Sequence, residues 1–526
     1  MMKSKATLFL LLLGLAGIAP FSKAQDGTLD VTYGDNGRVL LPQVEFLVEP
    51  FLALDAQNRA VVCSSVGDAF YAARLLPNGQ LDSTFGTGGV VRGQTESDLN
   101  QDITFGMALP GNKTLLVINA YNQDTLDETR IIVLDSTGKL DVGFGKAGIL
   151  RLNLSPGSGE EYLSAGLVQP DGKIVLAGNT TIPGLDISRG IVLRLHPNGT
   201  LDSTFNGDGR YDAPISLVFS LFSSIVLQPD GKLIVGGITF EPSNLSFLGL
   251  LLRLNSNGQL DLTFGSAGIV RLSALSSQLS GVTHITRAAD GKLLLTGVKL
   301  PNSDSLLVLR LNANGSVDNS FGVGGIAGLF PEGTQQNVAI RCSTQVDGKI
   351  IVLGISVIDS VSQELGYVLT RFRSDGKADT TFGDGGFVVQ GANQTVGDMA
   401  LQPDGKILVS GVYSLPTEGG LFVHRYNNNV VSTKEARLHL AHVRVFPNPA
   451  SEQASVQFEL DEPRRLQIDL LDVHGRLSAA VSPMRLWEAG QNTFSFDLPS
   501  LPKGLYWLRF SDEHGRTSAL PVAVQR

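Results

Sequence analysis

The sequence predicts an all-β chain in which residues 25–430 form a seven-bladed β-propeller, and three observations support this prediction. A phrase of the type Leu-Asp-x-Thr-Phe-Gly recurs seven times, and so does a turn of the type Asp-Gly-Lys followed by an apolar run. The repeat period is about 58 residues, which suits one four-stranded blade and is long for a helical repeat. Apolar runs such as KIVLAG are continuous, as expected for strands covered on both faces.

Each repeat predicts the same order of elements within a blade. A first strand is followed by the Asp-Gly-Lys turn, a second strand, a polar connection, a third strand, a second turn, the phrase and a short fourth strand. In the third repeat the strands are expected at residues 163–169, 173–178, 191–196 and 210–213. In the first two repeats Gln57-Asn58-Arg59 and Gly111-Asn112-Lys113 replace Asp-Gly-Lys.

The two motifs are out of phase, and this offset predicts how the ring closes. The last repeat has three strands but no phrase and no fourth strand, whereas the chain supplies both near its start, at residues 28–34 and 38–41. We predict that this segment pairs into the last blade, because pairing removes two open sheet edges. The expected propeller is therefore closed by its N-terminal strand, and we expect it to be a monomer.

The recurring phrase places an aspartate and an aromatic residue in every repeat. We expect a structural role, with the aspartate tying the turn through hydrogen bonds to the backbone and the ring wedged between blades. Weak calcium binding at one or two of these loops is the alternative, although no bidentate glutamate follows at loop spacing. No other cofactor is expected. The residues are Asp30, Tyr33, Asp82, Phe85, Asp141, Phe144, Asp202, Phe205, Asp261, Phe264, Asp318, Phe321, Asp379 and Phe382.

Residues 1–24 have the features of a secretory signal peptide. Lys3 and Lys5 precede an apolar stretch at residues 8–18, and Ser22-Lys23-Ala24 is a small-residue cleavage site. No later segment has the roughly 18 uninterrupted apolar residues of a membrane-spanning helix, so no membrane span is expected. The formal net charge of -9 disfavours nucleic acid as a partner, because phosphate groups demand a basic surface.

The sequence predicts no catalytic, cofactor or metal site. His196, His284 and His424 fall in separate blades without metal-ligand spacing, and no nucleophile elbow or phosphate-binding loop stands in a credible context. A ligand is expected at the polar connections between second and third strands, which differ between blades and converge on one loop face. These connections are residues 119–128, 179–189, 240–247, 301–305, 358–365 and 413–420.

The repeats resemble a known family. Segments such as QPDGKIVLAG, RLHPNGTLDSTFNGDG and LQPDGKILVSG are similar to the delta-60 repeat, a bacterial β-propeller repeat of similar length. The resemblance covers nearly all of residues 25–430. It implies the architecture and carries no reaction with it.

After a linker at residues 431–442, residues 443–526 predict a small Ig-like β-sandwich with alternating strands. This segment resembles the type A sorting domain of the type IX secretion system, on motifs that include Phe446, Pro447, Asn448, Pro449, Gly475, Gly504 and Tyr506. The resemblance implies Sec export to the periplasm and delivery by the type IX machinery, which would be a partner of residues 443–526. The protein is then secreted or held at the cell surface.

Two functions from different classes follow. The favoured prediction is a non-enzymatic cell-surface or secreted propeller that binds an extracellular protein, glycan or surface polymer through its loop face. The alternative is an extracellular polysaccharide hydrolase or lyase, which would need paired carboxylates and aromatic sugar platforms. The expected propeller contains no tryptophan, since Trp487 and Trp507 both lie in the C-terminal domain. This composition favours the binding protein.

Overall fold

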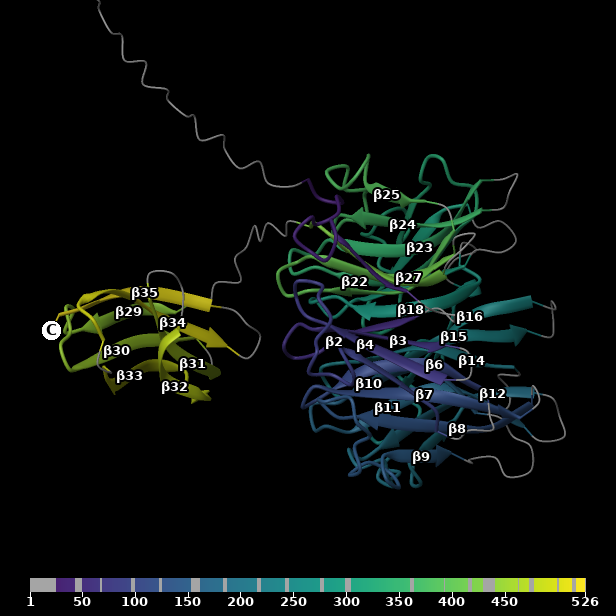
Figure 1. Ribbon diagram of the computed structural model, residues 1–526, viewed down its shortest axis with the longest axis horizontal. Helices are drawn as coiled ribbons and strands as arrows, with labels where there is room; N and C mark the ends of the chain where they lie inside the picture. The colour runs from purple at the N-terminus through teal and green to yellow at the C-terminus, as the bar shows by residue number, and fades with distance from the viewer. Residues whose placement is uncertain are drawn as a thin grey trace, which may run out of the picture. The chain divides into compact units, whose positions relative to one another are not determined.

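The computed structural model describes residues 25–42, 50–66, 69–95, 100–122, 125–152, 161–182, 187–214, 219–241, 246–274, 279–298, 304–359, 364–391, 393–414, 419–428, 440–461, 463–472, 477–498, 501–512 and 517–525. The chain divides into two compact units, residues 1–430 and 431–526 (Figure 1). In the described ranges every regular element is a β-strand except one 3₁₀ turn, η1 (Leu272–Ala274). The prediction of an all-β chain is confirmed. The predicted signal peptide lies outside the described residues.

The described part of the first unit contains seven four-stranded antiparallel sheets. Six of them consist of four consecutive strands each. Sheet 1 contains β2 (Phe51–Leu54), β3 (Ala60–Val66), β4 (Ala69–Leu75) and β5 (Val90–Gly93). Sheet 2 contains β6 (Asn100–Leu109), β7 (Lys113–Asn122), β8 (Thr125–Leu134) and β9 (Ile149–Leu152). Sheet 3 contains β10 (Glu161–Val168), β11 (Ile174–Ile182), β12 (Ile187–Leu195) and β13 (Arg210–Asp212).

The next three sheets repeat this order. Sheet 4 contains β14 (Leu221–Leu227), β15 (Leu233–Glu241), β16 (Ser246–Leu254) and β17 (Ile269–Arg271). Sheet 5 contains β18 (Gly281–Arg287), β19 (Leu293–Val298), β20 (Leu306–Leu311) and β21 (Ile326–Leu329). Sheet 6 contains β22 (Asn337–Thr344), β23 (Ile350–Asp359), β24 (Glu364–Phe372) and β25 (Phe387–Gln390).

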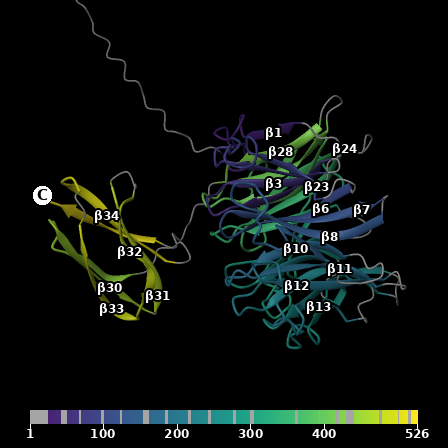
Figure 2. The ribbon, with the colours of Figure 1, turned by 60° about the horizontal axis from the view of Figure 1, so that its bottom comes forward.

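Sheet 7 joins the two ends of the unit. It contains β26 (Gln394–Leu401), β27 (Ile407–Ser414), β28 (Gly419–Tyr426) and, as its fourth strand, β1 (Arg38–Pro42) from the start of the chain. β1 pairs antiparallel with β28 in a register that places Arg38 opposite His424 and Leu41 opposite Leu421. Figure 2 shows β1 in purple beside β28 in green. The N-terminal segment therefore supplies the strand that the last repeat lacks.

Backbone hydrogen bonds connect the seven sheets in a cycle. In each case a residue at the end of the recurring phrase donates its N–H to the second turn of the next sheet, as Gly86 does to the Thr137 carbonyl over 2.8 Å. The cycle closes because Gly383 of sheet 6 donates to Asp26 and Gly34 of sheet 7 donates to Asn78. The other bonds of the cycle are Gly145 to Asn198, Asn206 to Asn257, Gly265 to Asn314 and Gly322 to Asp375.

The hydrophobic core lies between neighbouring sheets and follows the same cycle. One buried cluster, for example, combines Val192 of sheet 3 with Phe222 of sheet 4, and another combines Leu52 of sheet 1 with Leu421 of sheet 7. Five further clusters occupy the remaining junctions among the described residues. Because each sheet is covered on both faces, its strands carry the continuous apolar runs seen in the sequence.

In five of the six predicted connections between second and third strands, at least half of the residues belong to strands, so these connections are shorter than predicted. β7 and β8 pair as far as Asn122 opposite Thr125, and β15 and β16 pair as far as Glu241 opposite Ser246. The polar residues of these segments thus extend regular hairpins, since the backbone of two adjacent strands continues to pair wherever hydrogen bonds can form. The connection predicted at residues 301–305 lies largely outside the described residues.

The second unit consists of two antiparallel sheets around its own core. A three-stranded sheet contains β29 (Ala441–Phe446), β30 (Gln453–Leu460) and β33 (Gly490–Asp497). A four-stranded sheet contains β31 (Arg464–Leu471), β32 (Leu477–Trp487), β34 (Gly504–Asp512) and β35 (Thr517–Val524). Their buried side chains, among them Phe458, Trp487 and Phe510, form one cluster. β29 begins inside the segment predicted as a linker.

Candidate functional site

Within the described residues, six of the seven sheets contain the same buried or half-buried set of an arginine, an aspartate and an aromatic ring. In sheet 3, Asp202 Oδ1 accepts hydrogen bonds from the Thr204 backbone N–H and hydroxyl, and Oδ2 lies 2.7 Å from Arg194 Nε. The Arg194 guanidinium stands 4.7 Å from the centroid of the Phe205 ring and donates to the Ser256 carbonyl of sheet 4. The sets therefore link each turn to the next sheet.

The other five sets have nearly the same geometry. Their Arg-to-Asp distances are 2.7 or 2.8 Å, and their guanidinium-to-centroid distances are 4.3 to 4.9 Å. They are Arg74 with Asp82 and Phe85, Arg253 with Asp261 and Phe264, Arg310 with Asp318 and Phe321, Arg371 with Asp379 and Phe382, and Arg425 with Asp30 and Tyr33. The last set joins the two ends of the unit.

Sheet 2 is the exception among these sets. Val133 occupies the arginine position, as its carbonyl accepts the hydrogen bond from the Asp141 N–H, and Asp141 is bound instead by Lys113 Nζ over 2.5 Å. Phe144 is buried there without a guanidinium above it among the described side chains. The structure thus brings the predicted aspartate and aromatic residue together in each sheet. The arginine was not predicted, although a basic residue eight positions before the aspartate recurs in the sequence.

The environment of these aspartates keeps them ionised. Burial alone would raise the pKa of Asp30, but hydrogen bonds from Lys406 and Thr32 and the charge of Arg425 lower it to about 2. The same balance lowers the pKa of Asp202 well below its usual range. Since protein donors hold both carboxylate oxygens, the arrangement serves structure. No group of three or more His, Cys, Asp or Glu side chains that could hold a metal ion occurs in the part of the chain that the structure describes.

The first strands of the sheets form a second repeated structure. β2, β6, β10, β14, β18, β22 and β26 each contact the next, and β26 contacts β2. Six of them contain a β-bulge near their middle. In four consecutive first strands, the bulged residue is a serine or threonine whose hydroxyl donates to a carbonyl of the following first strand over 2.7 or 2.8 Å. These residues are Thr104, Ser164, Ser223 and Thr283.

This hydroxyl ladder is interrupted in three consecutive sheets. Ile340 and Gly397 occupy the bulged positions of β22 and β26, and Pro50 precedes β2. None of these side chains can donate a hydrogen bond. Polar contacts of another kind replace the ladder here. Arg341 Nε donates to Asp398 Oδ1 over 2.9 Å, and the Leu52 N–H donates to Asp398 Oδ2 over 3.1 Å.

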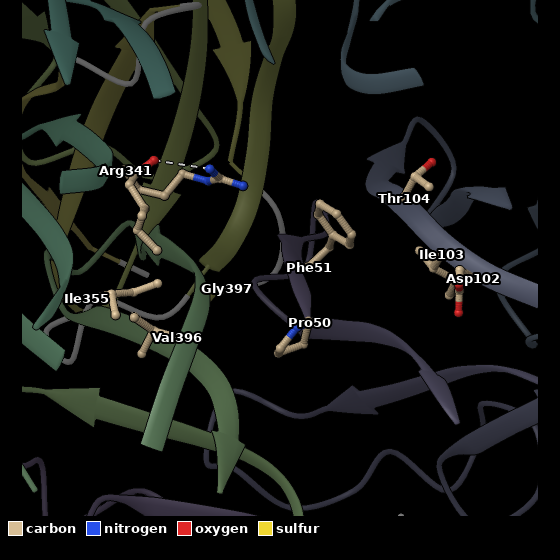
Figure 3. Close-up of a pocket in the computed structure, with 10 residues that line it drawn as sticks. Pro50, Phe51, Asp102, Ile103, Thr104, Arg341, Ile355, Val396 and Gly397 are labelled. Carbon is tan, nitrogen blue, oxygen red and sulfur yellow. Dashed lines mark hydrogen bonds between the residues drawn. The ribbon is translucent and has the colours of Figure 1, made fainter. Parts of the chain in front are cut away.

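A cavity of about 500 Å³ lies where the ladder is interrupted. Figure 3 shows Arg341, Ile355 and Val396 on one side of Phe51, with Thr104, Ile103 and Asp102 on the other. The volume falls within the roughly 300–1,000 Å³ of typical small-molecule sites. The lining residues are Pro50, Phe51, Asp102, Ile103, Thr104, Ile340, Arg341, Ile355, Val396 and Gly397.

The charged groups of the cavity differ in what holds them. Arg341 donates through Nε to Asp398 and through Nη1 to the Ile340 carbonyl, and Nη2 has no partner among the described residues. Asp398 accepts from Arg341, from Leu52 and from the Met399 N–H, so both of its oxygens are engaged. Burial raises the pKa of Asp102, the one acidic residue in the described lining. The cavity therefore combines an apolar wall with one cation and one acid.

The neighbouring histidine lies beside the buried Cys342. His284 occupies the position of Arg341 in β18, and its Nδ1 lies 3.4 Å from the Cys342 backbone N and 3.7 Å from Cys342 Sγ. Burial and the charge of Arg341 lower the pKa of His284 to about 3, so the ring is neutral at ordinary pH. Cys63 and Cys342 are both free and buried.

The predicted motif residues of the second unit are positioned by β35 and by the loops. Asn448 Oδ1 accepts from the Ala523 N–H over 2.8 Å, and Asn448 Nδ2 donates to the Pro521 carbonyl. Pro447 and Pro449 both follow cis peptide bonds. Tyr506 is buried, follows Gly504 in β34 and donates to the Pro502 carbonyl over 3.0 Å. Phe446 is largely exposed, and Gly475 lies outside the described residues.

The cavity was not predicted from the sequence, which predicted a ligand at the connections between second and third strands. A signal was nevertheless present, because one aligned position of the first strands carries a hydroxyl residue in four repeats and Ile340, Gly397 or Pro50 in the next three. Among the acidic residues of the predicted connections, Glu128 forms ion pairs with Arg130 and Arg151, and Glu364 accepts a hydrogen bond from Asn393. Asp124 and Asp186 lie outside the described residues.

Comparison with known proteins identifies both parts of the chain. A domain of unknown function described as a DUF5122 β-propeller matches residues 64–85, 169–205, 228–264, 288–321 and 345–382. A secretion system C-terminal sorting domain matches residues 444–520. The chain thus carries β-propeller repeats of the expected kind followed by a type IX sorting domain, which directs it to the cell surface or the exterior. No curated protein matches the sequence.

Several solved structures match this chain at low sequence identity. A protein of unknown function from Dyadobacter fermentans is 10% identical over 63% of this chain and 96% of its own, with a TM-score of 0.40. An ulvan lyase is 11% identical over 74% of this chain and 96% of its own, with a TM-score of 0.44. An α-L-arabinofuranosidase from Fusarium graminearum is 8% identical over 67% and 98%, with a TM-score of 0.39. At these values the likeness assigns no activity to this chain.

No helix in the described residues is long and apolar enough to cross a membrane.

Proposed function

We propose that this chain is an exported, non-enzymatic binding protein whose first unit is a seven-bladed β-propeller closed by β1. The type IX machinery delivers it through the C-terminal unit, an Ig-like sandwich, and the propeller acts at the cell surface or in the medium. The closed cycle of sheets and the sorting domain support this architecture. The ligand is an extracellular glycan or a related small polar molecule.

The observation that carries the binding function is the cavity at the interruption of the hydroxyl ladder. A repeated structure needs a departure from its repeat to create one asymmetric site, and Ile340, Gly397 and Pro50 are consecutive departures. The lining residues of β6 lie near the end of sheet 2 at which β7 turns into β8, because Asp102 pairs with Asn119 close to the end of β7. The site is therefore next to the loop face on which a ligand was expected.

A polysaccharide hydrolase or lyase is the second candidate, and the raised pKa of Asp102 favours it, because a general acid needs such a shift. Hydrolysis also requires a second free carboxylate. The described cavity lining has no other acid, and the oxygens of the nearby Asp398 are held by three donors. The single available acid makes binding better supported than hydrolysis.

Blocking the cavity tests the proposal. In the mature chain, residues 25–526, Gly397→Phe introduces a ring at a residue that lines the cavity, and Gly391→Phe is the control because nothing lies within 4 Å of a Cβ there. The probes are galactose, galacturonate, oligogalacturonides, malate and glycine, and the measurement is the shift of the melting temperature. We expect at least one probe to stabilise the wild type and the control but not Gly397→Phe.

Two other results would contradict the binding function. If no probe distinguishes the wild type from Gly397→Phe, the cavity is not a binding site for such molecules. If the wild type depolymerises polygalacturonate and Asp102→Asn abolishes this activity without lowering the melting temperature, the chain is an enzyme. The release of reducing ends and of unsaturated uronates measures that activity.

A further inference from the structure

We infer that the cavity selects a ligand with a carboxylate at one end and hydroxyl groups at the other, such as a uronic acid residue or a free hydroxy acid. This inference deepens the proposed function and rests on it. Arg341 binds the carboxylate, Asp102 and Thr104 bind the hydroxyl groups, and the apolar wall contacts the body of the ligand.

Arg341 is held in a position to receive a carboxylate. Its Nε is bound to Asp398 and its Nη1 to the Ile340 carbonyl, so the guanidinium plane is fixed before a ligand arrives. The side chain retains 24% of its exposure, and in Figure 3 its guanidinium points toward the space beside Phe51. Nη2 has no partner among the described residues. A guanidinium that is preorganised in this way binds an oxyanion with little further loss of conformational entropy.

The pairing with Asp398 leaves Arg341 able to bind an anion. Asp398 already neutralises the charge of the guanidinium. A ligand carboxylate is therefore held mainly by hydrogen bonds and less by net charge attraction. Such selectivity depends on the planar fork of arginine, because lysine offers a point charge with rotatable donors. Conversion to lysine should therefore weaken binding even though the charge remains.

The opposite side of the cavity favours hydroxyl groups over a second anion. Thr104 donates its own proton to the Leu163 carbonyl, so its oxygen is left to accept a hydrogen bond from a ligand. Asp102 is partly buried, and burial raises its pKa, because no cation among the described residues compensates its charge. Either protonation state of Asp102 can hydrogen-bond a hydroxyl group, whereas its charged state repels a carboxylate. The two ends of the cavity thus fix the direction of the ligand.

Titration of the mature chain with galacturonate, its neutral counterpart galactose, and malate tests this inference. We expect galacturonate, malate or both to bind at least 10-fold more tightly than galactose. Arg341→Met should weaken the carboxylate ligand about 10- to 100-fold, as removal of a charge-assisted hydrogen bond does. Because this variant leaves Asp398 without its cation, Arg341→Met/Asp398→Asn serves as a second variant. Arg287→Met, on β18 outside the cavity lining, should bind as the wild type does.

The outcomes separate this inference from the proposed function. A preference for galacturonate over malate identifies a uronic acid of a polymer, and the reverse identifies a free hydroxy acid; both support the carboxylate site. If galactose binds as tightly as galacturonate, and the Arg341 variants match the wild type while Gly397→Phe does not bind, the cavity function stands and the carboxylate inference is wrong. If Gly397→Phe also binds each probe like the wild type, both are wrong.

Discussion

Deletion of residues 25–42 from the mature chain is expected to remove about 5 kcal/mol or more of stability, a large share of the roughly 5–15 kcal/mol typical of a folded protein. The deletion removes β1 and therefore exposes the edge of β28, which will pair with other chains. It also removes Asp30, which lies 2.8 Å from Arg425 and 2.7 Å from Lys406, and so leaves buried Arg425 without its carboxylate.

Thermal unfolding and light scattering measure the two effects. We expect the deleted chain to melt at a much lower temperature and to form oligomers, and a synthetic peptide of residues 25–42 to restore both properties. A deleted chain that remains monomeric and melts at the wild-type temperature would show that β1 does not close the cycle. Arg425→Met, which keeps β1, should have a smaller effect than the deletion.

Arg194→Met is expected to destabilise the chain by about 3 kcal/mol, because it leaves a buried carboxylate short of its partner. Asp202 is fully buried, and Arg194 also bridges to the Ser256 carbonyl of the next sheet. The matched control is Asp141→Asn in sheet 2, where Val133 takes the place of the arginine and Lys113 is 41% exposed. That change should cost about 1 kcal/mol or less, as for other exposed ion pairs.

The pH dependence of the stability of Arg194→Met is a second test of the ion pair between Arg194 and Asp202. The folded-state pKa of Asp202 lies below the unfolded value of 3.8, so its stabilisation is fully present above pH 3.8 and is lost as the pH falls toward the folded pKa. The difference in unfolding free energy between wild type and variant should therefore shrink in acid. Denaturant unfolding at pH 7 and at pH 3 measures it, and a difference that is independent of pH would contradict the role given to Arg194.

The architecture was predictable because two motifs recur in a fixed order. The out-of-phase phrase at Asp30 and Tyr33 indicated where the cycle closes, and the structure places both residues against Arg425. The arginine itself was missed because a single basic residue at the end of an apolar strand is read as a solvated strand end. Its role becomes visible only when the turn brings Asp202 back to it, eight residues later.

The cavity could not be predicted for a different reason. A bulge adds one residue to a strand and therefore changes which side chains lie on each face of the sheet. No local signal in the sequences of β22 and β26 marks the position of the bulge. Arg341, Asp398 and Leu52 meet only because the cycle closes, since they come from sheets 6, 7 and 1. The shared role of four hydroxyl residues can be recognised only once the bulges are aligned. These residues are Thr104, Ser164, Ser223 and Thr283.

We propose that the propeller performs the function of the protein and that residues 443–526 direct its secretion. Expression of the full chain and of a chain truncated after Val430, in a host with a type IX system, tests it by cell fractionation and intact-mass measurement. We expect the full chain to appear outside the cell or on its surface, trimmed near residues 434–442, while the truncated chain stays in the periplasm. If both chains reach the exterior and the full chain is untrimmed, the C-terminal unit belongs to the working protein and the division is wrong.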